Sequence, residues 1–106
     1  MRLAAEAGLR PADIYSGPNG AIAQLRRLES WFAVQRDFCF YSSSVLIIYE
    51  GAADSAATAA VTVRLVDFAH TFPSGGRRDK NFLEGTRALA QALTNVLALE
   101  HHDSLV

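Results

Sequence analysis

A carboxylate and an imidazole stand near the end of an apolar segment of this chain. From Val63 to Phe72 the sequence reads VRLVDFAHTF, in which Asp67 follows Val66 and His70 comes three residues later. A strand of this character would normally continue with residues that it can bury, because burying a lone charge is costly. Asp67 is therefore expected to have a chemical task or a partner, unless it only caps a turn. His70 alone is typical of a hydrogen-bonding loop residue.

Three hydroxyls interrupt an earlier apolar segment. Ser42, Ser43 and Ser44 lie within FCFYSSSVLIIYE, which is rich in aromatic and β-branched residues and is typical of a strand. Side chains alternate along a strand, so at least one hydroxyl should face each side. Ser44 is expected to point inward because it shares parity with Phe38 and Phe40. The ordinary alternative is that the serines bond neighbouring backbone.

Composition limits the classes of protein to consider. The chain has 106 residues, 50% of them hydrophobic, with ten basic and eleven acidic side chains and a net charge of -1. These values indicate a globular segment of one domain or less. The basic clusters are small, Arg26-Arg27 and Arg77-Arg78-Lys80, so neither nucleic acid nor a membrane surface is expected as a partner.

With no membrane segment or signal peptide recognisable in the sequence, we expect an intracellular protein, in the nucleus, the cytoplasm or both. The longest apolar run, Val45 to Tyr49, is far shorter than the roughly 20 residues of a membrane helix, and the N-terminal residues do not resemble a signal peptide. Cys39 is the single cysteine, so an internal disulfide is impossible. It is either a reactive thiol or, as free cysteines commonly are, a small buried apolar residue.

Periodicity predicts an α+β fold in which an antiparallel hairpin packs with two helices. The first helix should run from Gly17 to about Gln35, capped by Ser16 or Asn19, with an apolar face and a wet face that includes Gln24 and Glu29. One long strand from Phe38 to Glu50 and a second from Ala60 to Asp67 should pair across the connection 51–59. The apolar face of the first helix comprises Ile22, Leu25, Leu28 and Phe32.

A loop rich in proline and glycine should then lead to a final helix. Asp79 is expected to cap this helix, which should reach about Leu99 before a polar tail. Its predicted buried stripe comprises Phe82, Thr86, Leu89, Leu93, Val96 and Leu97. Two helices are too few to cover both apolar faces of a lone hairpin, so the chain is expected to be incomplete as a functional unit.

Three segments in order resemble the inositol polyphosphate kinase family, C-terminal part, and most closely its multikinase branch. They are FYSSSVLIIYEG, VRLVDFAHTFPS and DKNFLEGTRALAQAL, and they match the serine-rich strand, the I-D-F-A strand end and the helix opening D-x-N-Y-L-x-G-L of that family. The resemblance covers about residues 14–97. It implies part of the C-lobe of a protein-kinase-like fold, with ATP bound between two lobes.

The resemblance also implies roles for the residues singled out above. Asp67 corresponds to the family's metal-binding aspartate, which would hold Mg²⁺ on the phosphates of ATP. His70 corresponds to a histidine at the inositol-phosphate site of multikinase-type members. Ser42, Ser43 and Ser44 would support the geometry beside the metal aspartate.

Two departures from the family limit what this chain can do. The motif P-x-x-x-D-x-K-x-G, which handles the inositol phosphate, does not occur in the sequence, and no N-lobe with a nucleotide-gripping lysine is present. One interpretation is therefore that the chain is a C-terminal fragment of an inositol polyphosphate multikinase. The full-length protein would have inositol polyphosphates and ATP as partners, and the fragment would be inactive alone. The alternative is a non-catalytic truncated paralogue that acts as a protein-interaction module. The oligomeric state stays open.

Overall fold

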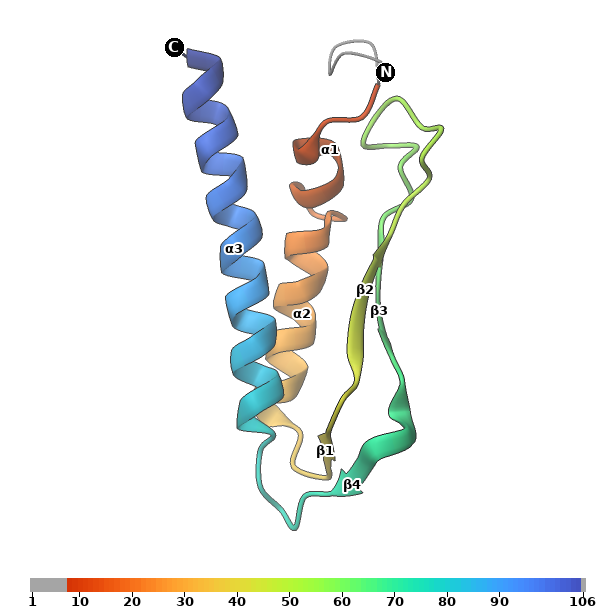
Figure 1. Cartoon of the computed structure of the whole chain (residues 1–106), viewed down its shortest axis with the longest axis vertical. Coiled ribbons are helices and arrows are strands. Elements are labelled where there is room, and N and C mark those ends of the chain that lie inside the picture. Colours follow the sequence, from red (N-terminus) through yellow and green to blue (C-terminus); the bar gives the residue numbers. More distant parts are fainter. Residues whose placement is uncertain (1–7, 106) are drawn as a thin grey trace.

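The computed structural model describes residues 8–105, and their side chains as far as residue 100. Two long helices run side by side and face a pair of extended strands (Figure 1). The fold is α+β, as the sequence predicts. In chain order the elements are α1 (Pro11–Tyr15), α2 (Ala21–Val34), β1 (Phe38–Phe40), β2 (Ser44–Ile48), β3 (Thr62–Val66), the 3-10 helix η1 (Phe68–His70), β4 (Thr71–Pro73) and α3 (Lys80–Leu105).

The strands form two separate antiparallel pairs. β2 pairs with β3, so the predicted hairpin is confirmed. β1 pairs with β4, which lies in the segment predicted to be a loop. The predicted single strand from Phe38 to Glu50 is wrong, because Ser42 has a φ of 59°. A left-handed residue cannot continue a strand, and the chain therefore changes direction between β1 and β2.

This break also decides which strand residues face the helices. Val45 pairs with Leu65 and Ile47 with Val63, and all four are half-buried. Ser44 pairs with Val66 on the opposite face and is exposed. The prediction that Ser44 points inward is wrong, since the turn at Ser42 resets the alternation that was counted from β1.

The first long helix begins later than predicted. Gly20, not Ser16 or Asn19, is the N-cap of α2. A side chain at Gly20 would collide with the carbonyl oxygen of Ser16, so the close approach of the chain requires glycine there. The short helix α1 was not predicted, although Pro11 at its first position is a recognised start signal. The helix α2 buries Ala21, Leu25 and Phe32.

The stripe predicted for the last helix is right in part. Leu83, Thr86 and Ala90 are the buried positions among the described side chains of α3, whereas Val96 is 45% exposed. Val96 lies six residues after Ala90, about 240° around the helix, and therefore points away from α2. The helix also continues to Leu105, through residues predicted to be a polar tail. No helix among the described residues combines the length and apolarity needed to cross a membrane.

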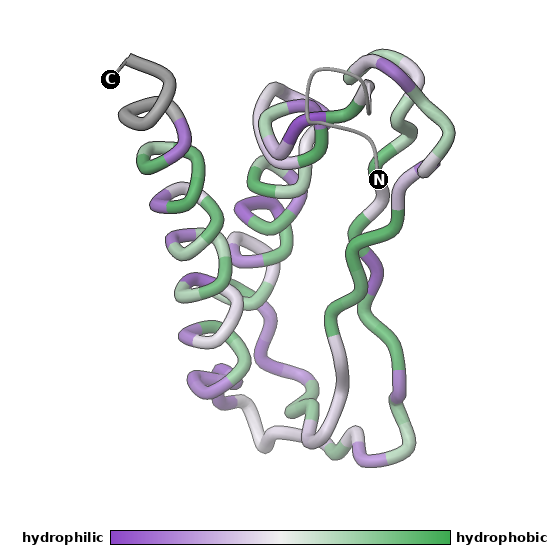
Figure 2. Tube along the Cα trace, turned by 45° about the horizontal axis from the view of Figure 1, so that its top comes forward, coloured by the Kyte–Doolittle hydropathy of each residue, from purple (hydrophilic) through white to green (hydrophobic). Residues whose placement is uncertain are grey.

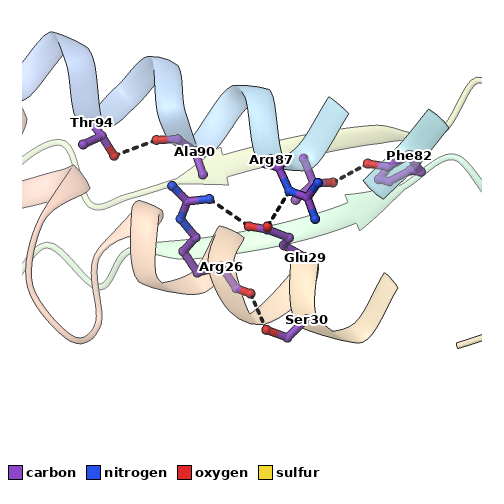
Figure 3. Close-up of polar contacts among 8 residues, drawn as sticks. Arg26, Glu29, Ser30, Phe82, Arg87, Ala90 and Thr94 are labelled. Carbon is purple, nitrogen blue, oxygen red and sulfur yellow. Dashed lines mark hydrogen bonds and ion pairs between the residues drawn. The ribbon is translucent and has the colours of Figure 1, made fainter. Parts of the chain in front are cut away.

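Two side chains assigned to the wet face of α2 in fact make tertiary contacts. The Gln24 amide donates to the carbonyl of Val61 at 2.7 Å and accepts from the backbone N–H of Val63 at 2.8 Å, as a neighbouring strand would. The Glu29 carboxylate accepts from Arg26 at 2.9 Å and from Arg87 of α3 at 2.8 Å (Figure 3). Sequence periodicity missed the contacts with Val61, Val63 and Arg87 because these partners are distant in the chain.

Candidate functional site

Asp67 ends β3 in a left-handed backbone conformation. Its φ and ψ are 72° and 63°, and its side chain is exposed. Aspartate is one of the few residues that adopt this conformation readily, because its short polar side chain bonds locally. The turn takes Asp67 out of the strand ladder, and its carboxylate faces solvent.

Two hydrogen bonds hold the turn that follows. The Ser43 hydroxyl donates to the carbonyl oxygen of Asp67 at 3.0 Å. The backbone N–H of Tyr41 donates to the carbonyl oxygen of His70, also at 3.0 Å. The segment that breaks the long strand therefore fastens both ends of η1. Of the three serines, Ser43 contacts Asp67, and the serine-rich run was the signal for it in the sequence.

An aromatic cluster anchors the same turn to the core. The ring of Phe68, directly after Asp67, lies 6.1 Å from that of Phe40 in β1. Phe40 in turn packs edge-on against Phe32 of α2 at 5.4 Å and Phe82 of α3 at 6.1 Å. Such contacts between rings stabilise a fold beyond the area that they bury. The cluster thus fixes the position of Asp67 relative to both long helices.

His70 is the last residue of η1, and its side chain is exposed. A 3-10 helix has about three residues per turn, so one turn separates Asp67 from His70. The structure therefore brings the predicted carboxylate and imidazole to the two ends of one fastened turn. It does not bring Ser42 or Ser44 into contact with Asp67 through any hydrogen bond of the described residues.

The Asp67 carboxylate is the type of ligand that Mg²⁺ prefers, but it is only one ligand. A carboxylate oxygen is the hard donor that Mg²⁺ prefers, and the cation needs about six oxygens. Among the side chains of residues 8–100, no group of three or more histidine, cysteine or acidic residues lies close enough to hold a metal. Asp67 fits as one ligand only, and nucleotide phosphates, water and other protein groups would have to supply the rest.

The turn lies on an open surface. Cavities of about 320, 520 and 150 Å³ occur among the described residues, and Asp67 and His70 line none of the three. Enzyme sites usually bury most of a small substrate in a concave pocket. Asp67 and His70 therefore lie outside these three cavities, on the exposed surface of the described residues.

Asp79 confirms a structural prediction beside this turn. Its carboxylate accepts the backbone N–H of Phe82 at 3.0 Å, the bond expected of a helix cap. The other carboxylate oxygen accepts the N–H of Phe40 at 2.7 Å. Asp79 is only 6% exposed, so its contacts with β1 and with the start of α3 are shielded from solvent.

Comparisons with known proteins agree on one family. The family of inositol polyphosphate kinases matches residues 12–94. Inositol polyphosphate multikinase beta of Arabidopsis thaliana is 37% identical over 99 residues, 87% of this chain and 33% of that protein. Inositol polyphosphate multikinase IPK2 of Oryza sativa subsp. indica is 40% identical over 94 residues, 82% of this chain and 31% of that protein.

A solved structure gives the same result. An inositol phosphate multikinase matches with a TM-score of 0.74 and 34% identity, over 81% of this chain and 38% of that chain. The chain thus spans about a third of the length of the relatives that it matches.

Proposed function

Because this chain belongs to the inositol polyphosphate kinase family, we propose that it forms the C-terminal part of an ATP-dependent inositol polyphosphate multikinase. The observation that carries the proposal is the fastened turn from Asp67 to His70, which presents a carboxylate and an imidazole on an open wall. The remaining wall, with the lysine and the P-x-x-x-D-x-K-x-G segment, would come from outside this chain. We place the assembled kinase inside the cell, in the nucleus, the cytoplasm or both.

In this proposal, Asp67 contributes one carboxylate oxygen to a Mg²⁺ ion. When bound there, Mg²⁺ would supply positive charge to offset the negative charge that develops on the phosphates during phosphoryl transfer. The Ser43 hydroxyl and the Phe68–Phe40 contact keep the Asp67 backbone in place. Rigid placement matters because Mg²⁺ demands near-ideal octahedral geometry.

His70 would act on the inositol polyphosphate. Its imidazole is exposed and can donate a hydrogen bond to a phosphate or hydroxyl oxygen. Tyr41 holds the backbone of His70 through the carbonyl oxygen, so the ring starts from a fixed position. This role is substrate binding, and it predicts a weaker effect on turnover than loss of Asp67.

Substitution of Asp67 tests the proposal in the kinase that contains the missing lobe. Asp67→Asn removes the charge and keeps the shape, so turnover at saturating ATP and Mg²⁺ should fall by orders of magnitude. Asp54→Asn, which changes another exposed carboxylate, is the matched control. If Asp67→Asn keeps more than about a tenth of wild-type turnover, a loss below roughly 1.4 kcal/mol, Asp67 is not the metal ligand.

A second candidate function rests on the outer face of the β2–β3 pair. Leu46 and Ile48 are 45% and 50% exposed there, and adjacent exposed apolar side chains are typical of interaction surfaces. A non-catalytic paralogue would use this face to bind another protein. The two candidates differ in one result: only the kinase proposal requires phosphoryl transfer to depend on Asp67 once the other lobe is supplied.

A further inference from the structure

A polar groove of about 520 Å³ lies between the exit of α2 and the start of α3. Arg36 reaches it from the segment after α2, and Cys39 from β1. Arg77, Arg78 and Lys80 come from the loop and first turn that begin α3. Figure 2 shows strongly hydrophilic residues along both segments. In the sequence Arg77-Arg78-Lys80 is only a small basic cluster, because nothing there places Arg36 beside it.

The groove has an excess of positive charge. Four of its lining side chains are cationic, and Asp79 is the one carboxylate, which gives a formal balance of plus three. Both oxygens of Asp79 already accept backbone N–H groups. The ion pairs among the described side chains join Glu29 to Arg26 and to Arg87, so none neutralises the four groove cations.

The N-terminal end of α3 adds to the positive potential of the groove. Lys80 is the first residue of a helix that spans 26 residues, and aligned peptide dipoles leave a partial positive charge at such an end. This contribution is smaller than that of the four side chains and falls off within the first turn. It has the same sign, so it strengthens the preference for an anion.

We propose that this groove binds a small anion that carries two or more phosphate groups, held by Arg36, Arg77, Arg78 and Lys80. A phosphate monoester carries about -1.5 to -2 charges at neutral pH, so a balance of plus three matches about two such groups. Arginine suits them because its planar fork pairs with phosphate oxygens in a bidentate manner. The volume falls in the range of small-molecule sites. Asp67 and His70 do not line the groove, so the proposal does not depend on the kinase assignment.

Inorganic tripolyphosphate is the probe for a direct test on the 106-residue chain. Titration calorimetry in about 0.15 M salt limits contributions from distant charges, because the screening length is then about 8 Å. The double substitution Arg77→Gln with Arg78→Gln should weaken binding by about tenfold or more, because each removes a charge-assisted hydrogen bond. Arg27→Gln with Arg64→Gln removes two exposed arginines outside the groove and is the matched control.

Cys39 supplies a local readout. It is the single cysteine of the chain and lines the groove, so its alkylation rate reports occupancy at this place and not elsewhere on the surface. Tripolyphosphate should slow the alkylation of Cys39 in wild type and in the control, and the groove variant should need about tenfold more tripolyphosphate for the same protection. Equal loss of affinity in both double variants, or no protection of Cys39 at saturating probe, would overturn the proposal.

A phosphorylated lipid headgroup and a free polyphosphate share this chemistry. Soluble inositol hexakisphosphate tests the free anion, and phosphatidylcholine vesicles with and without phosphatidylinositol bisphosphate test the headgroup. Binding that requires Arg77 and Arg78 in either arm supports the site and identifies the source. If neither probe distinguishes the groove variant from its control, the groove is not a phosphate site.

Discussion

Asp67 joins an exposed carboxylate to a left-handed backbone, and the two properties can be separated by substitution. Asparagine also tolerates a φ of 72°, whereas a β-branched residue does not. The requirement for a small polar residue at this turn is therefore structural as well as chemical.

The first expected outcome concerns the stability of this turn. Asp67→Asn should unfold at the same denaturant concentration as wild type, because its backbone preference is retained. Asp67→Val should be less stable by about 1 to 3 kcal/mol, the usual cost of a residue forced into a sparsely populated conformation. Urea unfolding followed by circular dichroism measures both. Equal stability of the two variants would show that the turn relaxes without strain.

Glu29 gives a second residue-scale expectation. The hydrogen bonds from Arg87 and then from Arg26 lower the pKa of Glu29 below its ordinary value of 4.5, against the opposing effect of desolvation. A lowered folded-state pKa contributes stability above the unfolded-state pKa, and this stability is lost as pH falls through the folded-state value.

Thermal unfolding of Glu29→Gln across pH tests that linkage. Its Tm should lie below that of wild type at pH 7, and the difference should shrink as pH falls below about 4.5. Glu84→Gln removes an exposed carboxylate of α3 and should show no such pH-dependent difference. A Tm difference that stays constant down to strongly acidic pH would mean that the ion pair across α2 and α3 does not stabilise the fold.

At the scale of elements, Asp79 links the start of α3 to β1. Asp79→Ala removes the cap of the helix and leaves the N–H of Phe40 without its acceptor. We expect a loss of about 2 kcal/mol in the free energy of unfolding. Asn81→Ala changes an exposed residue in the same turn and should have little effect. A loss confined to a few tenths of a kcal/mol would indicate that water replaces the carboxylate at both donors.

The buried stripe of α3 can be tested with a matched pair. Leu83→Ala should cost about 2 to 5 kcal/mol, because Leu83 is 6% exposed and its removal leaves a cavity. Val96→Ala should change stability by no more than about 0.5 kcal/mol, because Val96 is 45% exposed. Comparable losses from both variants would contradict the helix phase in which Leu83, Thr86 and Ala90 face α2.

At the scale of the whole molecule, Asp67 and His70 lie on an exposed surface of the described residues. They line none of the three cavities given above, and Lys80, the single lysine, lies in the separate basic groove. One carboxylate and one imidazole cannot position two phosphorylated substrates for in-line transfer. Leu46 and Ile48 are also exposed, on the outer face of the β2–β3 pair.

The isolated chain is therefore expected to transfer no phosphate from ATP to inositol trisphosphate. Radiolabelled ATP, with a no-protein reaction as background, measures this directly. A circular dichroism melt on the same sample shows whether the chain is folded during the assay. Labelled product above background from a folded sample would mean that this chain is sufficient for phosphoryl transfer. The proposal that the remaining catalytic groups come from outside this chain would then be wrong.

The sequence by itself determined those features that depend on neighbouring residues. Helical spacing predicted most of α2 and α3, alternation predicted the β2–β3 pair, and Asp79 identified the start of the last helix. Three ordered motifs also sufficed to indicate the family, because residue types at fixed spacing are local information.

Only the tertiary structure decided which distant segments meet. The pairing of β1 with β4, the Ser43 contact with Asp67 and the place of Arg36 beside Arg77 all join residues more than twenty positions apart. The turn at Ser42 reverses the predicted direction of Ser44, because one left-handed residue resets the alternation of a strand. Such features depend on which surfaces of the folded chain compete for contact, and the periodicity of a single segment does not contain that information.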